Sequence, residues 1–305
     1  MKRIFKPRKG SVVVLKKTKP GMCGGTDATL DTKAPKRIDS GEMTLFQVES
    51  VLNGTPGDDD RIGFISAFAA PAGENTFVYL MTGEPFRRGE RRGSWALIKE
   101  NIFPRLAALV NECDLAAKNG LHSTTHGLPE NFGGSADIRY ASGEAISFSN
   151  NQTPVISRAA GVKIAEFFQK AMSGEKAKLP DISALKAISY EENRRNGGFT
   201  RASLTLLPDG TATNEKRTKY DDPMVYESAG TVDAETVKAI KANIENTGLL
   251  AWEGLPANGY PFSNESSLEF VFENGRTIKV KGDRVTPAQL SNGFFNIQLE
   301  MTAKH

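Results

Sequence analysis

The sequence predicts an α+β protein formed by tandem duplication of a β-β-(β)-α-β-β unit, with mainly antiparallel sheets and with the two units packed as a pseudo-dimer. Three observations predict this class: an internal similarity that aligns without gaps, an amphipathic helix in each half, and a composition typical of globular chains. Of the 305 residues, 39% are hydrophobic and 25% are charged. That length fits about two domains of ordinary size.

The internal similarity relates residues 135–148 to residues 267–280. Both segments alternate apolar and polar residues around a central turn, which is the pattern of a β-hairpin. The pair Asn274 and Gly275 predicts a type I′ turn, because both central positions of that turn need a positive φ. The aligned pairs are Asp137 with Glu269, Tyr140 with Phe272, Gly143 with Gly275, and Ile146 with Ile278.

Four shorter matches occur in the same order along both halves of the chain. They pair residues 127–129 with 254–256, 153–154 with 286–287, 63–64 with 198–199, and 71–73 with 208–210. Five ordered matches favour duplication over chance. One unit alone covers only one face of its sheet, so two units packed together would bury the remaining apolar faces.

Each half is expected to carry a helix between its hairpins. In the first half Pro104 suits the first helical turn and Gly120 ends the segment. The apolar stripe of this helix is Leu106, Leu109, Val110, Cys113 and Ala117. In the second half Asp233 is the expected N-cap and Gly248 the C-terminal glycine. Its apolar face is Val237, Ile240 and Ile244.

Three further elements complete the prediction. An extra amphipathic turn or two is expected over residues 94–103, and a second helix over residues 157–173 with Ala160, Ile164, Phe167 and Phe168 facing inward. A final strand is expected over residues 293–301, because Phe295, Ile297, Leu299 and Met301 alternate with other residues.

The charge distribution suggests how the chain is organised. Residues 1–37 contain eleven Lys or Arg and two Asp, a net charge of +9, and the remaining residues have a net charge of −6. We therefore expect a flexible basic arm over residues 1–40. The first unit then covers residues 41–173, a linker 174–186 and the second unit 187–305.

Compartment signals are few. The only apolar run near the start is Val12–Leu15, which is shorter than the roughly 7–15 residues of a secretory signal. No segment approaches the ~20 apolar residues of a membrane span. We therefore expect a cytoplasmic protein without a membrane span. In its general pattern the chain resembles bacterial proteins built from tandem α+β units, and this resemblance implies no activity.

The familiar catalytic motifs are missing from the sequence, including G-x-S-x-G, G-x-x-x-x-G-K-[ST], G-x-G-x-x-G, H-E-x-x-H and C-x-x-C. No cofactor is expected. His122 and His126, with Glu130 as a third ligand, are the candidate metal site, because imidazole and carboxylate groups bind transition metals. The alternative is a pair of solvated loop residues.

Two other groups are candidates for binding. Arg87, Arg88, Arg91 and Arg92 precede an expected helix N-terminus and could bind an anion, because guanidinium groups and free backbone N–H groups both favour one. The alternative is a solvated hairpin loop. Trp252, Tyr260 and Phe262 are a candidate aromatic patch, or else they cover the core beneath a loop.

Three functions remain open at this stage. The preferred one is a non-enzymatic binding or scaffolding module that engages another protein or an acidic ligand through loops or sheet edges. The second is a metal-assisted enzyme that uses His122 and His126 with a nearby carboxylate. The third is an anion or nucleic-acid binder that uses the basic arm together with residues 87–92.

Overall fold

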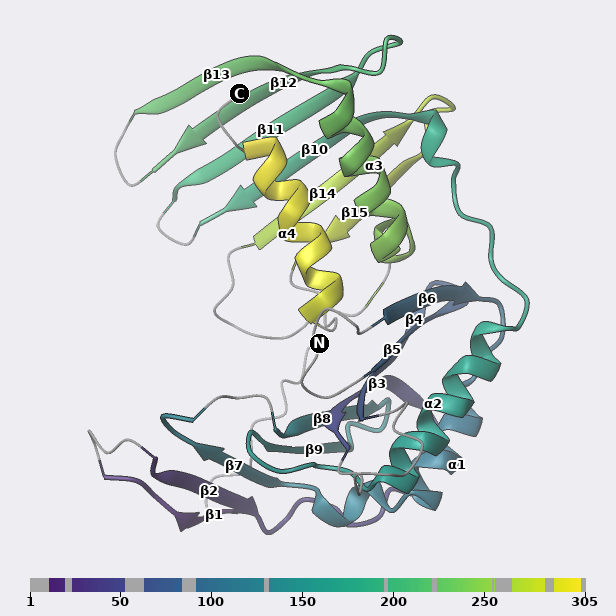
Figure 1. The fold of residues 1–305 in the computed structure, drawn as a ribbon, viewed down its shortest axis with the longest axis vertical. Coiled ribbons are helices and arrows are strands. Elements are labelled where there is room, and N and C mark those ends of the chain that lie inside the picture. Colours follow the sequence, from purple (N-terminus) through teal and green to yellow (C-terminus); the bar gives the residue numbers. More distant parts are fainter. Residues whose placement is uncertain are drawn as a thin grey trace. The chain divides into compact units, whose positions relative to one another are not determined.

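The computed structural model describes residues 11–19, 24–52, 63–83, 92–128, 132–194, 197–220, 224–253, 255, 265–282 and 288–302. The chain divides into two compact units, Met1–Lys176 and Ala177–His305 (Figure 1). Each unit contains one mainly antiparallel sheet with helices on one face. The predicted α+β class is therefore confirmed. Within the described residues, no helix is both long enough and apolar enough to cross a membrane.

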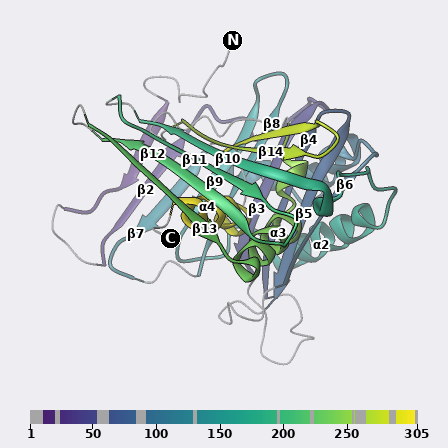
Figure 2. The ribbon, with the colours of Figure 1, turned by 90° about the horizontal axis from the view of Figure 1, so that it is seen from above.

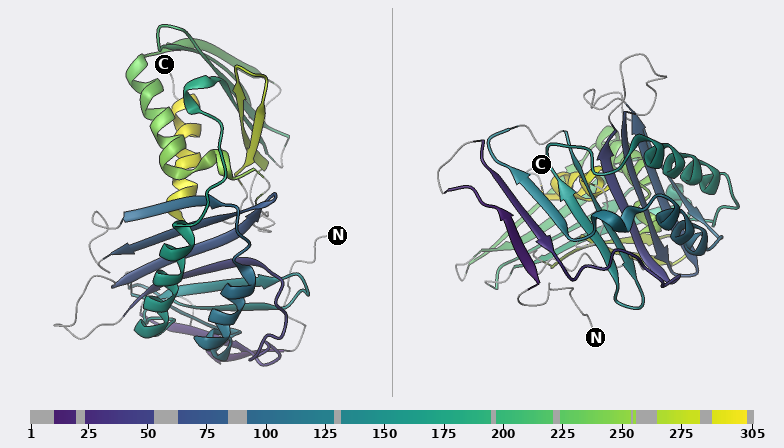
Figure 3. Two further views of the ribbon diagram at one scale, coloured as in Figure 1. Left: turned by 90° about the vertical axis from the view of Figure 1, so that its right-hand side faces the viewer. Right: turned by 90° about the horizontal axis from the view of Figure 1, so that it is seen from below.

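The first unit has a nine-stranded sheet in the order β1-β2-β7-β9-β8-β3-β4-β5-β6. Its strands are β1 (Val12–Lys16), β2 (Thr26–Asp31), β3 (Met43–Val51), β4 (Phe64–Ala72), β5 (Asn75–Gly83), β6 (Arg92–Ile98), β7 (Leu121–Thr125), β8 (Gly134–Tyr140) and β9 (Ala145–Asn150). Strands β7 and β9 are parallel. Helices α1 (Phe103–Glu112) and α2 (Arg158–Met172) cover one face of this sheet (Figure 3).

The second unit has a six-stranded sheet in the order β13-β12-β11-β10-β14-β15. Its strands are β10 (Leu185–Asn193), β11 (Phe199–Leu206), β12 (Ala212–Lys219), β13 (Val225–Val232), β14 (Glu265–Phe272) and β15 (Thr277–Lys281). Figure 2 shows these strands lying over α3 (Ala234–Thr247) and α4 (Ala288–Thr302). Phe294 of α4 contacts Tyr190 of β10, with ring centroids 6.5 Å apart.

Six strands and two helices follow the same order in both units. The order β9-β8-β3-β4-β5-β6 in the first sheet corresponds to β15-β14-β10-β11-β12-β13 in the second. Along the chain, a helix follows β6 and β9 in the first unit, and a helix follows β13 and β15 in the second. The β8–β9 and β14–β15 hairpins therefore occupy corresponding places. A register shift lies between Met43 and Leu45 where β3 pairs with β8, and another between Leu185 and Ala187 where β10 pairs with β14.

The predicted type I′ turn at residues 274–275 is wrong. Gly275 has φ +80°, but Asn274 is not among the residues of positive φ. The Gly275 N–H donates to the Phe272 carbonyl at 2.9 Å, and the Phe272 N–H donates to the Arg276 carbonyl at 2.9 Å. This is a turn that ends in one left-handed glycine. The β8–β9 hairpin makes the same turn, with Gly143 at φ +86°.

Two predicted elements have the opposite secondary structure. Residues 94–98 belong to strand β6, and α1 begins at Phe103 rather than before it. Residues 293–301 belong to helix α4 rather than a strand. The buried residues of α4 are Phe294, Ile297 and Met301, and their spacing of three and four residues is helical.

The predicted helices at 157–173 and after Asp233 are confirmed. Ser157 caps α2 by accepting a hydrogen bond from the Ala160 N–H. Asp233 caps α3 by accepting from the Thr236 N–H, and Gly248 ends α3 at φ +64°. Cap residues and helical periodicity are local signals, so the sequence alone places both ends.

The two sheets differ on the face opposite the helices of their own unit, which we call the helix-free face. By strand register, this face of β4, β5 and β6 carries apolar side chains, which are Phe68, Phe77, Tyr79, Met81, Trp95 and Leu97. On the corresponding strands β11, β12 and β13 the positions are mostly polar, and they are Ser203, Thr213, Glu215, Arg217, Ala229 and Thr231. The helix-free face of the second sheet is therefore suited to contact with water.

Candidate functional site

The first sheet continues beyond the shared six strands through β7, β2 and β1, which we call the extension. Val12 of β1 pairs with Asp31 of β2, and Ala28 of β2 pairs with Ser123 of β7. The expectation of a flexible arm over residues 1–40 is therefore wrong for residues 12–16 and 26–31. These strands bond to distant neighbours and have no buried face, so their sequence lacks an apolar period. Residues 1–10 and 20–23 lie outside the described residues.

Strand β1 is the outermost strand of the sheet and is exposed on both faces. The exposed fractions of its apolar residues are 42% for Val12, 45% for Val13, 58% for Val14 and 53% for Leu15. Within the described residues, β2 is its only strand neighbour, so its outer N–H and C=O groups pair with no strand. Natural edge strands are usually short, charged or covered, because such groups attract another chain. An apolar exposed edge therefore marks a place where a further strand can add.

A buried asparagine anchors the extension to the rest of the unit. The Asn119 Nδ2 group donates to the carbonyls of Pro35 at 2.9 Å and Ala145 at 2.8 Å, and its Oδ1 accepts from the Ser147 N–H at 2.8 Å. These bonds join the segment after β2 to β9 and to the turn before β7. The extension is therefore held by specific hydrogen bonds rather than by apolar packing.

His122 connects β7 to its parallel neighbour β9. Its Nδ1 lies 3.0 Å from the Ser149 hydroxyl oxygen. The side chain is half-buried, and burial lowers the pKa of the imidazole. Only two residue pairs join these strands, His122 with Ser149 and Ser123 with Asn150, so this contact reinforces a short ladder.

His126 connects the end of β7 to β2. Its Nε2 lies 3.2 Å from Oδ2 of Asp27. The Asp27 carboxylate also accepts a hydrogen bond from the Thr18 N–H. This backbone bond, followed by the contact with His126, lowers the pKa of Asp27. Both contacts hold β2 in place.

The two histidines therefore serve separate contacts in this structure. Four residues along a strand span about 13 Å, so His122 and His126 do not converge as they would on a helix. Glu130 lies outside the described residues. Within the described part of the chain, no group of three or more His, Cys, Asp or Glu side chains could hold a metal ion. The metal site with Glu130 stays a prediction.

The other candidate residues are only partly described. Arg87, Arg88 and Arg91 lie outside the described residues, and Arg92 is known only as the first residue of β6. Tyr260 and Phe262 also lie outside them. Trp252 is 1% exposed and belongs to the core of the second unit. The arginine site and the aromatic patch stay predictions, although Trp252 is no surface residue here.

Residues 12–15 were not among the sites predicted from the sequence. The signal was present, because this is a run of four apolar residues followed by Lys16 and Lys17. As a sequence pattern, the run indicates only an apolar segment too short for a secretory signal. The chain matches no protein-family model and has no match among curated proteins.

Proposed function

We propose that this protein is a non-enzymatic binding or scaffolding module that holds a partner protein by adding an extended segment of that partner to strand β1. The observation that carries the proposal is the run of four exposed apolar residues on an outermost strand, Val12–Leu15. In such strand addition, backbone hydrogen bonds supply affinity and alternate side chains supply specificity.

Charge indicates the kind of segment that β1 would accept. Lys16, Lys17 and Lys19 follow the apolar run, and residues 1–37 have a net charge of +9. An extended segment with an apolar centre and flanking Asp or Glu residues complements this pattern. A second copy of the chain would bring a second basic segment to the same place, and like charges oppose that pairing.

A peptide titration tests this proposal. The probe is a synthetic peptide of β-branched residues flanked by Asp and Glu, measured by fluorescence anisotropy and by hydrogen exchange. Binding should protect the amides of residues 12–16. The double variant Val12→Lys/Val14→Lys should weaken binding by at least tenfold. The matched control is Leu128→Lys, because Leu128 is 50% exposed just after β7, and it should bind normally.

Other outcomes would replace this function with an alternative. A dimer that forms without peptide and is abolished by the β1 variant would assign the edge to a second copy. Tighter binding to DNA or RNA than to the peptide, with a steep salt dependence and no protection of residues 12–16, would favour the nucleic-acid function. No binding of the peptide would reject the proposed function.

We also propose that the two units arose from one duplicated β-β-β-β-α-β-β-α unit. Support comes from the equal order of six strands and two helices, and from the equivalent register shifts beside Met43 and Leu185. The expected pseudo-dimer, in which each unit buries the apolar sheet face of the other, has weaker support. It needs an apolar helix-free face on both sheets, and only the first sheet carries one.

A further inference from the structure

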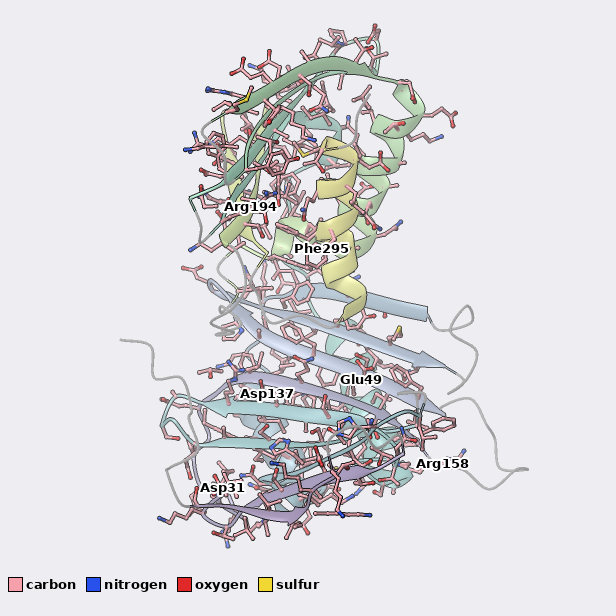
Figure 4. The ribbon with its side chains drawn as sticks, turned by 90° about the vertical axis from the view of Figure 1, so that its left-hand side faces the viewer. Asp31, Glu49, Asp137, Arg158, Arg194 and Phe295 are labelled. Atoms are coloured by element: carbon pink, nitrogen blue, oxygen red, sulfur yellow. The ribbon has the colours of Figure 1, made fainter. Side chains whose placement is uncertain are left out.

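A cluster of polar and aromatic side chains lies at one end of the second sheet. By register, Glu192, Thr200, Thr218 and Tyr226 form one row across β10, β11, β12 and β13. The row lies on the face that α4 covers, because Tyr190, two residues before Glu192, contacts Phe294. Figure 4 looks onto this end of the unit, where Arg194 follows β10 and Phe295 comes from α4.

Arg194 is held in place by three neighbours. Its Nη2 donates to the Thr200 hydroxyl oxygen at 3.3 Å and lies 3.6 Å from the Glu192 carboxylate. Its guanidinium carbon lies 5.3 Å from the centre of the Tyr220 ring, a favourable cation–π arrangement. Both polar contacts use Nη2. Within the described residues, Nε and Nη1 make no hydrogen bond, so they remain available to an acceptor.

A buried hydroxyl group beside this cluster lacks a partner among the described residues. Thr218 is 4% exposed, and its Oγ1 makes no hydrogen bond. Thr218 pairs directly with Thr200, which accepts the bond from Arg194. Leaving a buried hydroxyl unpaired is unfavourable, so an unpaired one next to a guanidinium with spare donors is consistent with a missing ligand.

The surroundings supply an apolar surface. Tyr220 and Tyr226 contact each other with ring centroids 5.7 Å apart. Both are about half exposed. We propose that the Arg194 side chain, the Thr218 hydroxyl and these aromatic rings bind a small organic carboxylate. Its oxygens would accept hydrogen bonds from Arg194 and Thr218, and its apolar body would lie on Tyr220 and Tyr226.

A ligand titration with the full chain tests this site. The probe is 3-phenylpropionate, followed by calorimetry, with 3-phenylpropanamide and inorganic phosphate as comparisons. The carboxylate should bind, and the neutral amide should bind at least tenfold more weakly, since it cannot form the charged pair. Equal binding of phosphate would overturn the role of the apolar surface. No binding of 3-phenylpropionate would overturn the proposal.

Variants separate binding from folding. Arg194→Gln should weaken 3-phenylpropionate binding by about tenfold or more, and Arg194→Lys, which keeps the charge, should weaken it less. Thr218→Val should weaken binding several-fold without lowering Tm, because it removes an unpaired buried hydroxyl. A lower Tm with unchanged affinity would show a purely structural role and overturn the proposal.

The matched control is Arg201→Gln. Arg201 lies on the opposite face of the sheet, where it pairs with Glu191 at 3.2 Å and stacks on Phe199. This variant removes the same charge from a neighbouring strand and should leave 3-phenylpropionate binding unchanged. Equal weakening by Arg201→Gln and Arg194→Gln would reduce the effect to overall charge and reject the site.

Discussion

Phe68 in β4 and Ser203 in β11 stand at corresponding positions of the two sheets, yet Phe68 is fully buried and Ser203 is partly exposed. The same contrast holds for Tyr79 and Glu215 on the next strands. One strand order therefore accepts two kinds of sheet, one apolar on both faces and one apolar on the helix-covered face only. Topology and surface chemistry are therefore separable in this protein.

The two sheets also differ in the strands that form one of their edges. The second sheet ends at β15, whereas the first continues from β9 into β7, β2 and β1. The proposed partner-binding edge belongs to this added part, and the proposed carboxylate site belongs to the second unit. If the units share an ancestor, each binding surface lies where the two have diverged.

Exchanging the contrasting residues gives the largest expected effect. Phe68→Ser should destabilise the first unit by about 3–5 kcal/mol, because it removes a fully buried ring and leaves a cavity. Ser203→Phe should change stability by about 0.5 kcal/mol or less, as for most surface substitutions. Urea denaturation with hydrogen exchange measures both. Equal losses would show that the two faces are not chemically distinct.

Replacing either of two buried asparagines by alanine should lower the free energy of unfolding by a smaller amount. Asn119→Ala should cost about 2–3 kcal/mol, because it leaves the carbonyls of Pro35 and Ala145 and the Ser147 amide unpaired. Within the described residues, Asn214 in the second unit donates one bond, to the Met301 carbonyl at 3.1 Å, and its Oδ1 has no partner. Asn214→Ala should therefore cost only about 1 kcal/mol. Chemical denaturation measures both, and a larger loss from Asn214→Ala would contradict this account.

Hydrogen exchange localises the effect of Asn119→Ala. The variant should speed exchange in β1 and β2, while the second unit exchanges at its normal rate. Unchanged exchange in β1 and β2 would show that Asn119 does not anchor the extension.

The turn glycines at corresponding positions test whether the two hairpins are equivalent. Gly143→Ala and Gly275→Ala should each cost about 1 kcal/mol, because alanine is strained at positive φ. A Cβ at either position meets nothing within 4 Å, so the cost is conformational in both. The control is Gly41→Ala, which is equally open but has no positive φ. Thermal denaturation should show similar losses for the first two and none for the control; unequal losses would argue against equivalent turns.

The smallest predicted effect is a pH dependence of stability that is confined to the first unit. Burial lowers the pKa of His122 below its ordinary 6.5, so the unfolded chain binds the proton more readily. The stability from the neutral imidazole is complete above pH 6.5 and falls as the pH drops below it. Hydrogen exchange in β7, corrected for intrinsic rates, should show weaker protection at about pH 5.5 than at about pH 7.5.

His122→Gln is the control for this pH effect and should remove most of it. The second unit has no histidine among its described residues and should not respond over this range. The Asp27 contribution acts below its ordinary pKa of 3.8 and does not interfere. A response of equal size in both units would assign the effect to another group.

Helices with local signals could be predicted from the sequence. The prediction was wrong where the apolar residues of one segment fit both the period of a strand and the period of a helix. Helices α2 and α3 have cap residues and a clear helical stripe, so both could be placed. In α4 the alternating set that includes Phe295 and Leu299 suggested a strand, although these two residues are exposed in the helix. Short apolar runs such as Trp95–Ile98 fit either structure until their neighbours are known.

The candidate site was harder to predict than the fold. The spacing of His122 and His126 suggested a metal site, but their contacts in the structure are Ser149 and Asp27, which lie 27 and 99 residues away in sequence. Sequence spacing therefore suggested a shared ligand where the sheet provides two separate contacts. Arg194 and Thr218 carried no motif at all, since their proximity depends on the pairing of β10, β11 and β12.

The aromatic face of the first sheet has a consequence for aggregation. Phe68 and Phe77 lie on the adjacent strands β4 and β5, and both rings are fully buried. A partly unfolded chain exposes both rings, and exposed apolar surface on unpaired strands favours aggregation. Variants that destabilise β4 or β5 are therefore expected to aggregate as well as to unfold.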